Sequence, residues 1–297
     1  MDNFVIQLAD SIYQPESIRQ NQGQQHSQGK LELICKEYKI CDNFRERLRV
    51  LKDIEIVVIC DDSGSMKSPA EKNNPQTTRW DELKHLVRIL VDIASVIDDN
   101  GIDIYFLNRP EMLGVKTPEG LEVTFNLGPN GPTPITPVLK RILKIKCATS
   151  RIIMIATDGL PTMPNGNVDI DGFKHALRHD RHNNDYTTIL ACTEDKKVMS
   201  YLNNWDKEIP RLDVIDDYRH ERKEVLKAQG PDFPFSFGDY IVKALLGSYD
   251  KYFDQLDEKN LSTSHASQTS QLNYSGYAPP HSSYNGHADN GCVCLVQ

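Results

Sequence analysis

Short apolar runs alternate with helical repeats along the middle of the chain. Two runs are apolar almost throughout, as expected for strands covered on both faces: 54–60 (IEIVVIC) and 151–157 (RIIMIAT). A further strand is predicted at 186–192 (YTTILAC). Shorter strands are predicted at 102–107, 121–127 and 211–215. Apolar residues spaced three and four apart predict helices at 78–97, 136–145, 171–179, 196–205 and 237–256. Thr78 and Asp81 have the spacing of a capping box at the start of the first helix.

This alternation predicts the class of fold. Strands that follow one another through helices form crossover units, which build a mostly parallel sheet with helices on both faces. We therefore expect an α/β, Rossmann-like, doubly wound domain. The strand at 121–127 follows a loop with no helix before it, so we expect it to pair antiparallel at an edge of the sheet.

The two ends of the chain differ from this middle part. Residues 1–50 form a polar extension, rich in glutamine, that is expected to be partly disordered and to hold a possible helix at 31–49. The folded domain is predicted at 51–258. Residues 259–297 are rich in serine and poor in aliphatic side chains, which predicts a disordered tail.

Composition places the chain among ordinary soluble globular proteins, with 39% apolar and 26% charged residues. A net charge of -8 argues against a nucleic acid partner, for which a basic face is expected. The seven cysteines are scattered, the first residues lack the pattern of a signal peptide, and no apolar run is long enough to span a membrane. These features predict a reducing, cytoplasmic location.

Oxygen-bearing side chains follow two of the predicted strands. Asp61 and Asp62 come directly after 54–60, and Asp158 comes directly after 151–157. Ligands of open parallel sheets bind beyond the carboxyl ends of the strands. Carboxylate and hydroxyl oxygens are the ligands that Mg²⁺ prefers, and Mn²⁺ and Ca²⁺ accept them too. The sequence therefore predicts a divalent cation at this edge of the sheet.

The first of these loops has a suggestive spacing. In the pattern D-x-S-x-S, Asp61, Ser63 and Ser65 occupy alternate positions of one turn, so their side chains can point the same way. Gly64 allows close approach because it has no Cβ atom. The loop NLGPNGPTPITP, between the two acidic strand ends, adds Thr133.

The segments DDSGSM, NGPTPITPVL and ATDGLPT resemble the three loops of a metal-ion-dependent adhesion site (MIDAS). That site marks von Willebrand factor type A (vWA) domains, which occur in integrins, copines and many intracellular proteins. The resemblance covers about residues 51–258, and departs from the family at Pro132, where a second glycine is common. The metal ligands that it implies are Asp61, Ser63, Ser65, Thr133 and Asp158.

The resemblance also implies a function. It indicates Mg²⁺-dependent binding of a protein partner, whose acidic side chain completes the coordination of the cation. The alternative is a metal-dependent hydrolase of phosphoesters that uses the same acidic site. We expect no enzyme, because position 63 is serine where an aspartyl-phosphate phosphatase needs a second aspartate, and no motif places a histidine as base.

Two simpler interpretations explain less of the sequence. Asp61 as a turn or capping residue accounts for one loop but not for three that agree. A phosphorelay receiver needs an aspartate after the strand at 102–107, which ends in YFLNRP.

The histidines at 175, 179 and 182 have helical spacing, but we interpret them as surface residues and not as a metal site.

The last four residues form a further motif. Cys294-Leu295-Val296-Gln297 matches C-a-a-X, and a terminal glutamine favours a farnesyl group on Cys294. One lipid holds a membrane only marginally, and the neighbouring Cys292 is a candidate for palmitoylation as the second signal. The sequence thus predicts a protein held on the cytoplasmic face of a membrane by its lipid anchor.

Overall fold

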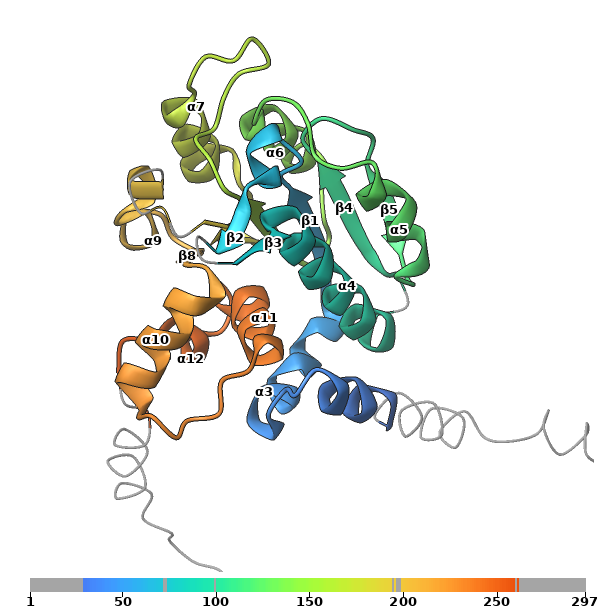
Figure 1. The fold of residues 1–297 in the computed structure, drawn as a ribbon, viewed down its shortest axis with the longest axis vertical. Coiled ribbons are helices and arrows are strands. Elements are labelled where there is room, and N and C mark those ends of the chain that lie inside the picture. The colour runs from blue at the N-terminus through green and yellow to red at the C-terminus, as the bar shows by residue number, and fades with distance from the viewer. Residues whose placement is uncertain are drawn as a thin grey trace, which may run out of the picture. The chain divides into compact units, whose positions relative to one another are not determined.

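The computed structural model describes residues 29–71, 74–98, 100–193, 195, 199–259 and 261, of which 74 and 75 are described only in their backbone. Its centre is a six-stranded sheet in the order β5-β4-β1-β6-β7-β8 (Figure 1). The strands are β1 Ile54–Cys60, β4 Ile102–Phe106, β5 Met112–Val115, β6 Ser150–Thr157, β7 Asp185–Ala191 and β8 Leu212–Ile215. Every neighbouring pair is parallel except β4 and β5. The predicted mostly parallel sheet with one antiparallel edge strand is confirmed.

The position of the edge strand differs from the prediction. The edge is β5, whereas the segment predicted as a strand at 121–127 lies largely in a helix, α5 (Glu119–Asn126). Leu121 and Phe125, four residues apart, are 2% exposed, while Val123 is 74% exposed. Burial at i and i+4 is the pattern of a helix with one apolar face, and this pattern outweighs the β-branched residues between.

Helices fill the connections between the strands. They are α4 Arg79–Ile97, α6 Ile135–Leu143, α7 Ile170–His175 with a π-helical continuation Ala176–Asp180, α9 Trp205–Glu208, α10 Tyr218–Gln229, α11 Phe237–Leu246 and α12 Lys251–Asp254. Thr78 and Asp81 form the predicted capping box of α4. The helix predicted at 237–256 is divided in two, with Asp250 capping the second part. Of the helix predicted at 196–205, the structure describes a 3-10 turn at Ser200–Leu202 and the start of α9.

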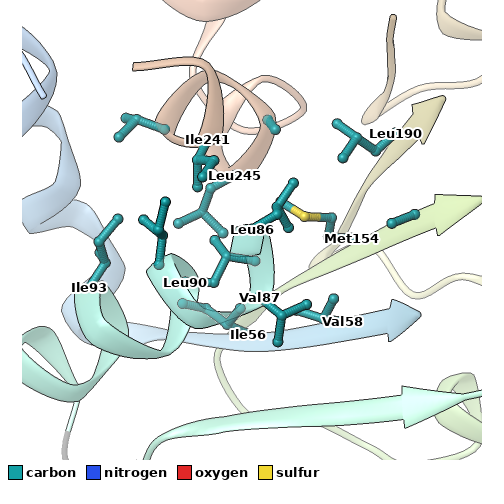
Figure 2. Packing of buried hydrophobic residues seen from close by; sticks show 14 of the residues in the cluster. Ile56, Val58, Leu86, Val87, Leu90, Ile93, Met154, Leu190, Ile241 and Leu245 are labelled. Carbon is teal, nitrogen blue, oxygen red and sulfur yellow. The ribbon is translucent and has the colours of Figure 1, made fainter. Parts of the chain in front are cut away.

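The sheet is covered on both faces, as a doubly wound fold requires. Alternate residues of β1 belong to two separate apolar clusters: Ile56 and Val58 to one, Val57 and Ile59 to the other. Figure 2 shows the first cluster, in which α4 and α11 cover the strands; it contains Ile56, Val58, Leu86, Val87, Leu90, Ile93, Met154, Leu190, Ile241 and Leu245. Residues of α6, α7 and α9 pack against the second face.

The segment before β1 contributes to the same core. It forms a helix over residues 29–37, then α3 (Asp42–Arg47) and a 3-10 helix (Leu48–Asp53). The buried apolar side chains of this segment lie in the cluster of α4 and α11; they are Leu31, Cys35, Ile40, Phe44, Leu48 and Leu51. The hydrophobic core therefore extends N-terminal to the predicted start of the domain at residue 51.

The two predicted lipidation sites, Cys292 and Cys294, lie outside the described residues, as do residues 1–28. Of the helices that the structure does describe, none combines the length and the apolar character needed to cross a bilayer.

A buried ionic cluster links α10, α11 and β8. Lys243 of α11 is 2% exposed, and its Nζ lies 3.1 Å from Glu221 Oε1 and 3.4 Å from Asp257 Oδ1. Asp213 of β8 is buried nearby, and its Oδ2 atom has no hydrogen-bond partner among the residues that the structure describes. Burial is the main cause that raises the pKa of Glu221 to about 7 and that of Asp213 to about 6, against the opposing effect of Lys243.

This cluster makes stability depend on pH. Glu221 holds its proton to a higher pH in the folded state than in the unfolded state, where its pKa is about 4.5. The free energy of unfolding therefore falls as the pH rises from about 4.5 to about 7, with a slope of at most about 1.4 kcal/mol per pH unit for this group. We expect Glu221→Gln to remove that slope in urea unfolding measured at pH 5 to 8. Glu224→Gln, an exposed change on the same helix, should retain it, and identical profiles for both variants would contradict the assignment.

Candidate metal centre

The candidate site lies where the strand order reverses. From β1 the chain reaches β4 on one side of β1 and later β6 on the other, so the carboxyl end of β1 is the topological switch point of the sheet. The residues after β1, after β6 and before α6 meet at this edge. Asp61 continues the pairing of the strands, since its N–H donates to Ala156 O at 3.0 Å.

Asp61 is buried and held in place by two hydrogen bonds. Its side chain is reached by the Ser63 N–H, which donates to Oδ1 at 2.9 Å, and by the Thr157 hydroxyl, which donates to Oδ2 at 2.6 Å. Burial, and then the charge of Asp158, raise the pKa of Asp61 to about 6. The charged form of Asp61 is therefore disfavoured both by burial and by the neighbouring carboxylate.

Ser63, Ser65 and Asp158 are joined by their side-chain oxygens. The two serine hydroxyls are hydrogen bonded at 3.0 Å, and Ser65 Oγ donates to Asp158 Oδ1 at 2.7 Å. Two neighbouring ligands on an octahedral Mg²⁺ with bonds of 2.0–2.1 Å are about 2.9 Å apart. The spacing of these oxygens therefore matches adjacent coordination positions of that ion.

Thr133 comes to the same place from the loop before α6. A Cβ atom built on Gly159 would lie 4.0 Å from Thr133 Oγ1 and 4.0 Å from Ser65 Oγ, so both hydroxyls border the same glycine. The N–H of Thr133 donates to Thr162 Oγ1 at 3.0 Å, and Gly64 N–H donates to Gly131 O at 3.0 Å. The three loops are thus in direct contact, with the five sequence-predicted residues at their junction.

The chemistry of this donor set suits a hard cation. Its members are two carboxylates and three hydroxyls, all of them oxygen donors, as Mg²⁺ prefers. Among the described residues there is no cluster of three or more histidine, cysteine, aspartate or glutamate side chains that could hold a metal. A cation bound here would therefore depend on the hydroxyl groups as much as on Asp61 and Asp158.

Asp62 has a different role, which the sequence did not reveal. Its Oδ1 accepts the N–H groups of Leu107 and Asn108 at 3.0 and 2.8 Å, and its Oδ2 lies 2.6 Å from Arg109 Nε. Asp62 is 0% exposed. It fastens the end of β1 to the end of β4, and its side-chain oxygens are engaged by residues 107–109.

Arg79 is the other residue that sequence reasoning missed. It is the first residue of α4, and its NH1 lies 2.6 Å from Asp158 Oδ2. The sequence does place Arg79 directly after the capping residue Thr78. A residue at that position lies at the start of a helix, and this helix starts close to the first loop.

Comparison with known proteins gives structural likenesses but no likeness to a family or a curated sequence. No family model matches the chain, and no curated protein matches it. One solved structure that it resembles is the D319A mutant of the PilB minor pilin from Streptococcus sanguinis, with 12% identity and a TM-score of 0.45. The match covers 69% of this chain and 62% of that chain.

Proposed function

We propose that this chain is a vWA-type module that binds a protein partner through a divalent cation, with Mg²⁺ as the first candidate. The observation that carries the proposal is the junction of three loops at the switch point. There, Ser63 Oγ, Ser65 Oγ and Asp158 Oδ1 follow one another at 3.0 and 2.7 Å. Mg²⁺ binds several oxygen ligands at close spacing, and here such oxygens come together from loops that are far apart in the sequence.

The roles of the residues follow from their positions. Ser63, Ser65 and Thr133 would offer hydroxyl oxygens, and Asp61 and Asp158 would offer negative charge, either directly or through water. The bound cation would supply an electrophilic position for an acidic side chain of the partner. Thr157 orients Asp61 by donating to its Oδ2, which leaves Oδ1 to the first loop.

A binding role is favoured over hydrolysis by the surroundings of the serines. Within the part of the chain that the structure describes, the hydrogen bonds of the Ser63 and Ser65 side chains go to each other, to Asp61 and to Asp158, and not to a histidine base. The phosphoester hydrolase remains the competing function. Turnover of a phosphoester that is lost in Asp61→Ala would favour it.

Calorimetric titration with Mg²⁺ tests the site. We expect Asp61→Ala and Asp158→Ala each to lower the affinity by about a hundredfold or more, since even groups that only orient metal ligands contribute about 10–100-fold. Asp171→Ala, an exposed acidic residue of α7, is the matched control and should bind as the unaltered protein does. Unchanged affinity in both site variants would contradict the assignment.

The partner and the membrane anchor belong to the same proposal. Capture of a protein that is lost on addition of EDTA and in Asp158→Ala would support metal-bridged binding. Tethering through prenylation of Cys294, with palmitoylation of Cys292 as the second signal, rests on the C-terminal sequence.

A further inference from the structure

Arg79 occupies one oxygen of a candidate metal ligand. Its NH1 lies 2.6 Å from Asp158 Oδ2, and the other oxygen of Asp158 accepts the Ser65 hydroxyl. The Asp158 side chain is 0% exposed and that of Arg79 is 18% exposed. Both oxygens of this buried carboxylate are therefore engaged by groups of the chain itself.

The Arg79 guanidinium is incompletely satisfied in this position. Its Nε atom is buried and has no hydrogen-bond partner within the described residues. A buried donor without a partner is unfavourable, because it has given up its hydrogen bonds to water without a replacement. The ion pair with Asp158 therefore leaves one N–H of the guanidinium without a hydrogen bond. A divalent cation bound to the same carboxylate would not have this unsatisfied donor.

Arg109, on the neighbouring aspartate, shows the contrast. Its Nε donates to Asp62, its NH1 to Thr124 O at 2.7 Å and its NH2 to Gly128 O at 2.6 Å. All three nitrogens have acceptors, as expected of a fixed structural pair. The two arginines are similarly shielded, with side chains 14% and 18% exposed, so the difference lies in their partners and not in their access to water.

Arg79 also borders a small hollow beside the site. The hollow lies between α4, the end of β7 and the start of α10, and its lining includes Glu82, Asp217 and Tyr218. Two of these residues are acidic. Glu82 already pairs with Arg219, and Asp217 lies against Arg219 and His220, so a guanidinium that leaves Asp158 would share these carboxylates with them.

We propose that Arg79 is a resident counter-cation that competes with the divalent ion for Asp158 and so lowers the affinity of the site for it. This inference rests on the proposed metal site. In the metal-free protein Arg79 offsets the charge of the buried carboxylate Asp158. Binding of the divalent ion weakens or breaks the Arg79–Asp158 pair. The measured affinity for the ion therefore includes the free energy that is lost with this pair.

Mg²⁺ titration of Arg79→Gln tests this competition. Because a positive charge next to the ligand carboxylate is removed, we expect Mg²⁺ to bind about tenfold more tightly or better than to the unaltered protein. Arg79→Lys retains the charge and should remain within a few fold of the unaltered protein. Affinity that is unchanged or lower in Arg79→Gln would overturn the proposal.

A second measurement covers loss of stability in the variant. In EDTA, Arg79→Gln should melt at a lower temperature than the unaltered protein, because Asp158 loses its counter-charge. The increase in melting temperature on adding Mg²⁺ should be larger for Arg79→Gln, since tighter binding to the folded state stabilises it more. An equal or smaller increase would overturn the competition.

The outcomes separate this inference from the proposed function. If Asp158→Ala abolishes Mg²⁺ binding but Arg79→Gln binds as the unaltered protein does, the metal site stands and the role of Arg79 is wrong. If neither the unaltered protein nor Arg79→Gln binds Mg²⁺, both fall together.

Discussion

Replacing Asp62 with alanine is expected to lower the free energy of unfolding by about 3–5 kcal/mol, the usual result of removing one partner of a buried ion pair. The change leaves the Arg109 guanidinium without its counter-charge and the N–H groups of Leu107 and Asn108 without an acceptor. Urea unfolding in EDTA, followed by far-UV circular dichroism, measures the loss.

The adjacent residue is the matched control. Asp61 is as deeply buried as Asp62, at 1% and 0% exposed, but its charge is opposed by Asp158 and not balanced by an arginine bonded to it. In EDTA we therefore expect Asp61→Ala to cost less than about 2 kcal/mol, the loss of two hydrogen bonds being partly offset by relief of repulsion. Equal losses for the two variants would contradict this division of roles.

Phe44→Ala is expected to be as damaging as Asp62→Ala. Phe44 of α3 is 0% exposed and packs edge to face on Phe253, with ring centroids 4.9 Å apart. Removing a buried phenylalanine costs about 3–5 kcal/mol. Thermal and urea unfolding of the complete chain should show the loss in a single cooperative transition, because the segment before β1 belongs to the same core as α4 and α11.

Leu33→Ala provides the comparison for this segment, since Leu33 is 68% exposed and should change stability by no more than about 0.5 kcal/mol. If Phe44→Ala is equally mild, residues 29–53 do not contribute to the stability of the domain. Burial of their side chains would then add nothing measurable to the free energy of unfolding.

The strongest local patterns predicted their elements well. The runs at 54–60 and 151–157 are apolar on both faces, and the structure places both at the centre of the sheet. The capping box at Thr78 and Asp81 correctly marked the start of α4. These signals succeed because one segment contains all the information that decides its own structure.

Other elements depend on distant contacts that no local pattern reveals. In α10, only Glu221 and Val225 are buried, and Glu221 is buried because Lys243 lies opposite it, so the helix shows almost no apolar face. The hairpin of β2 (Pro69–Glu71) and β3 (Asn74–Thr78) contains no large aliphatic or aromatic residue and was not predicted. In α5 the residues Leu121 and Phe125 had the helical spacing, but the intervening valine and threonine favoured a strand.

The candidate site also combines residues that local patterns predict with contacts that they do not. The residues named as ligands come from loops that directly follow or precede recognisable elements, and the parallel sheet brings such loops to one edge. The partners of Asp62 and Asp158 are arginines 47 and 79 positions away. Parallel pairing of Cys60 with Phe106 places residue 62 next to 107–109, so the Asp62 contact follows once the register of β1 and β4 is known.

The main-chain bonds between the loops have a consequence for protein engineering. Gly64 N–H to Gly131 O, Asn130 N–H to Asp62 O and Thr162 N–H to Thr133 O join the loops mostly through backbone atoms. The frame of the site is therefore largely independent of the side chains of Ser63 and Ser65. Under the proposed function, other donor groups introduced at these two positions would change which ion is bound, while the loops keep their paths.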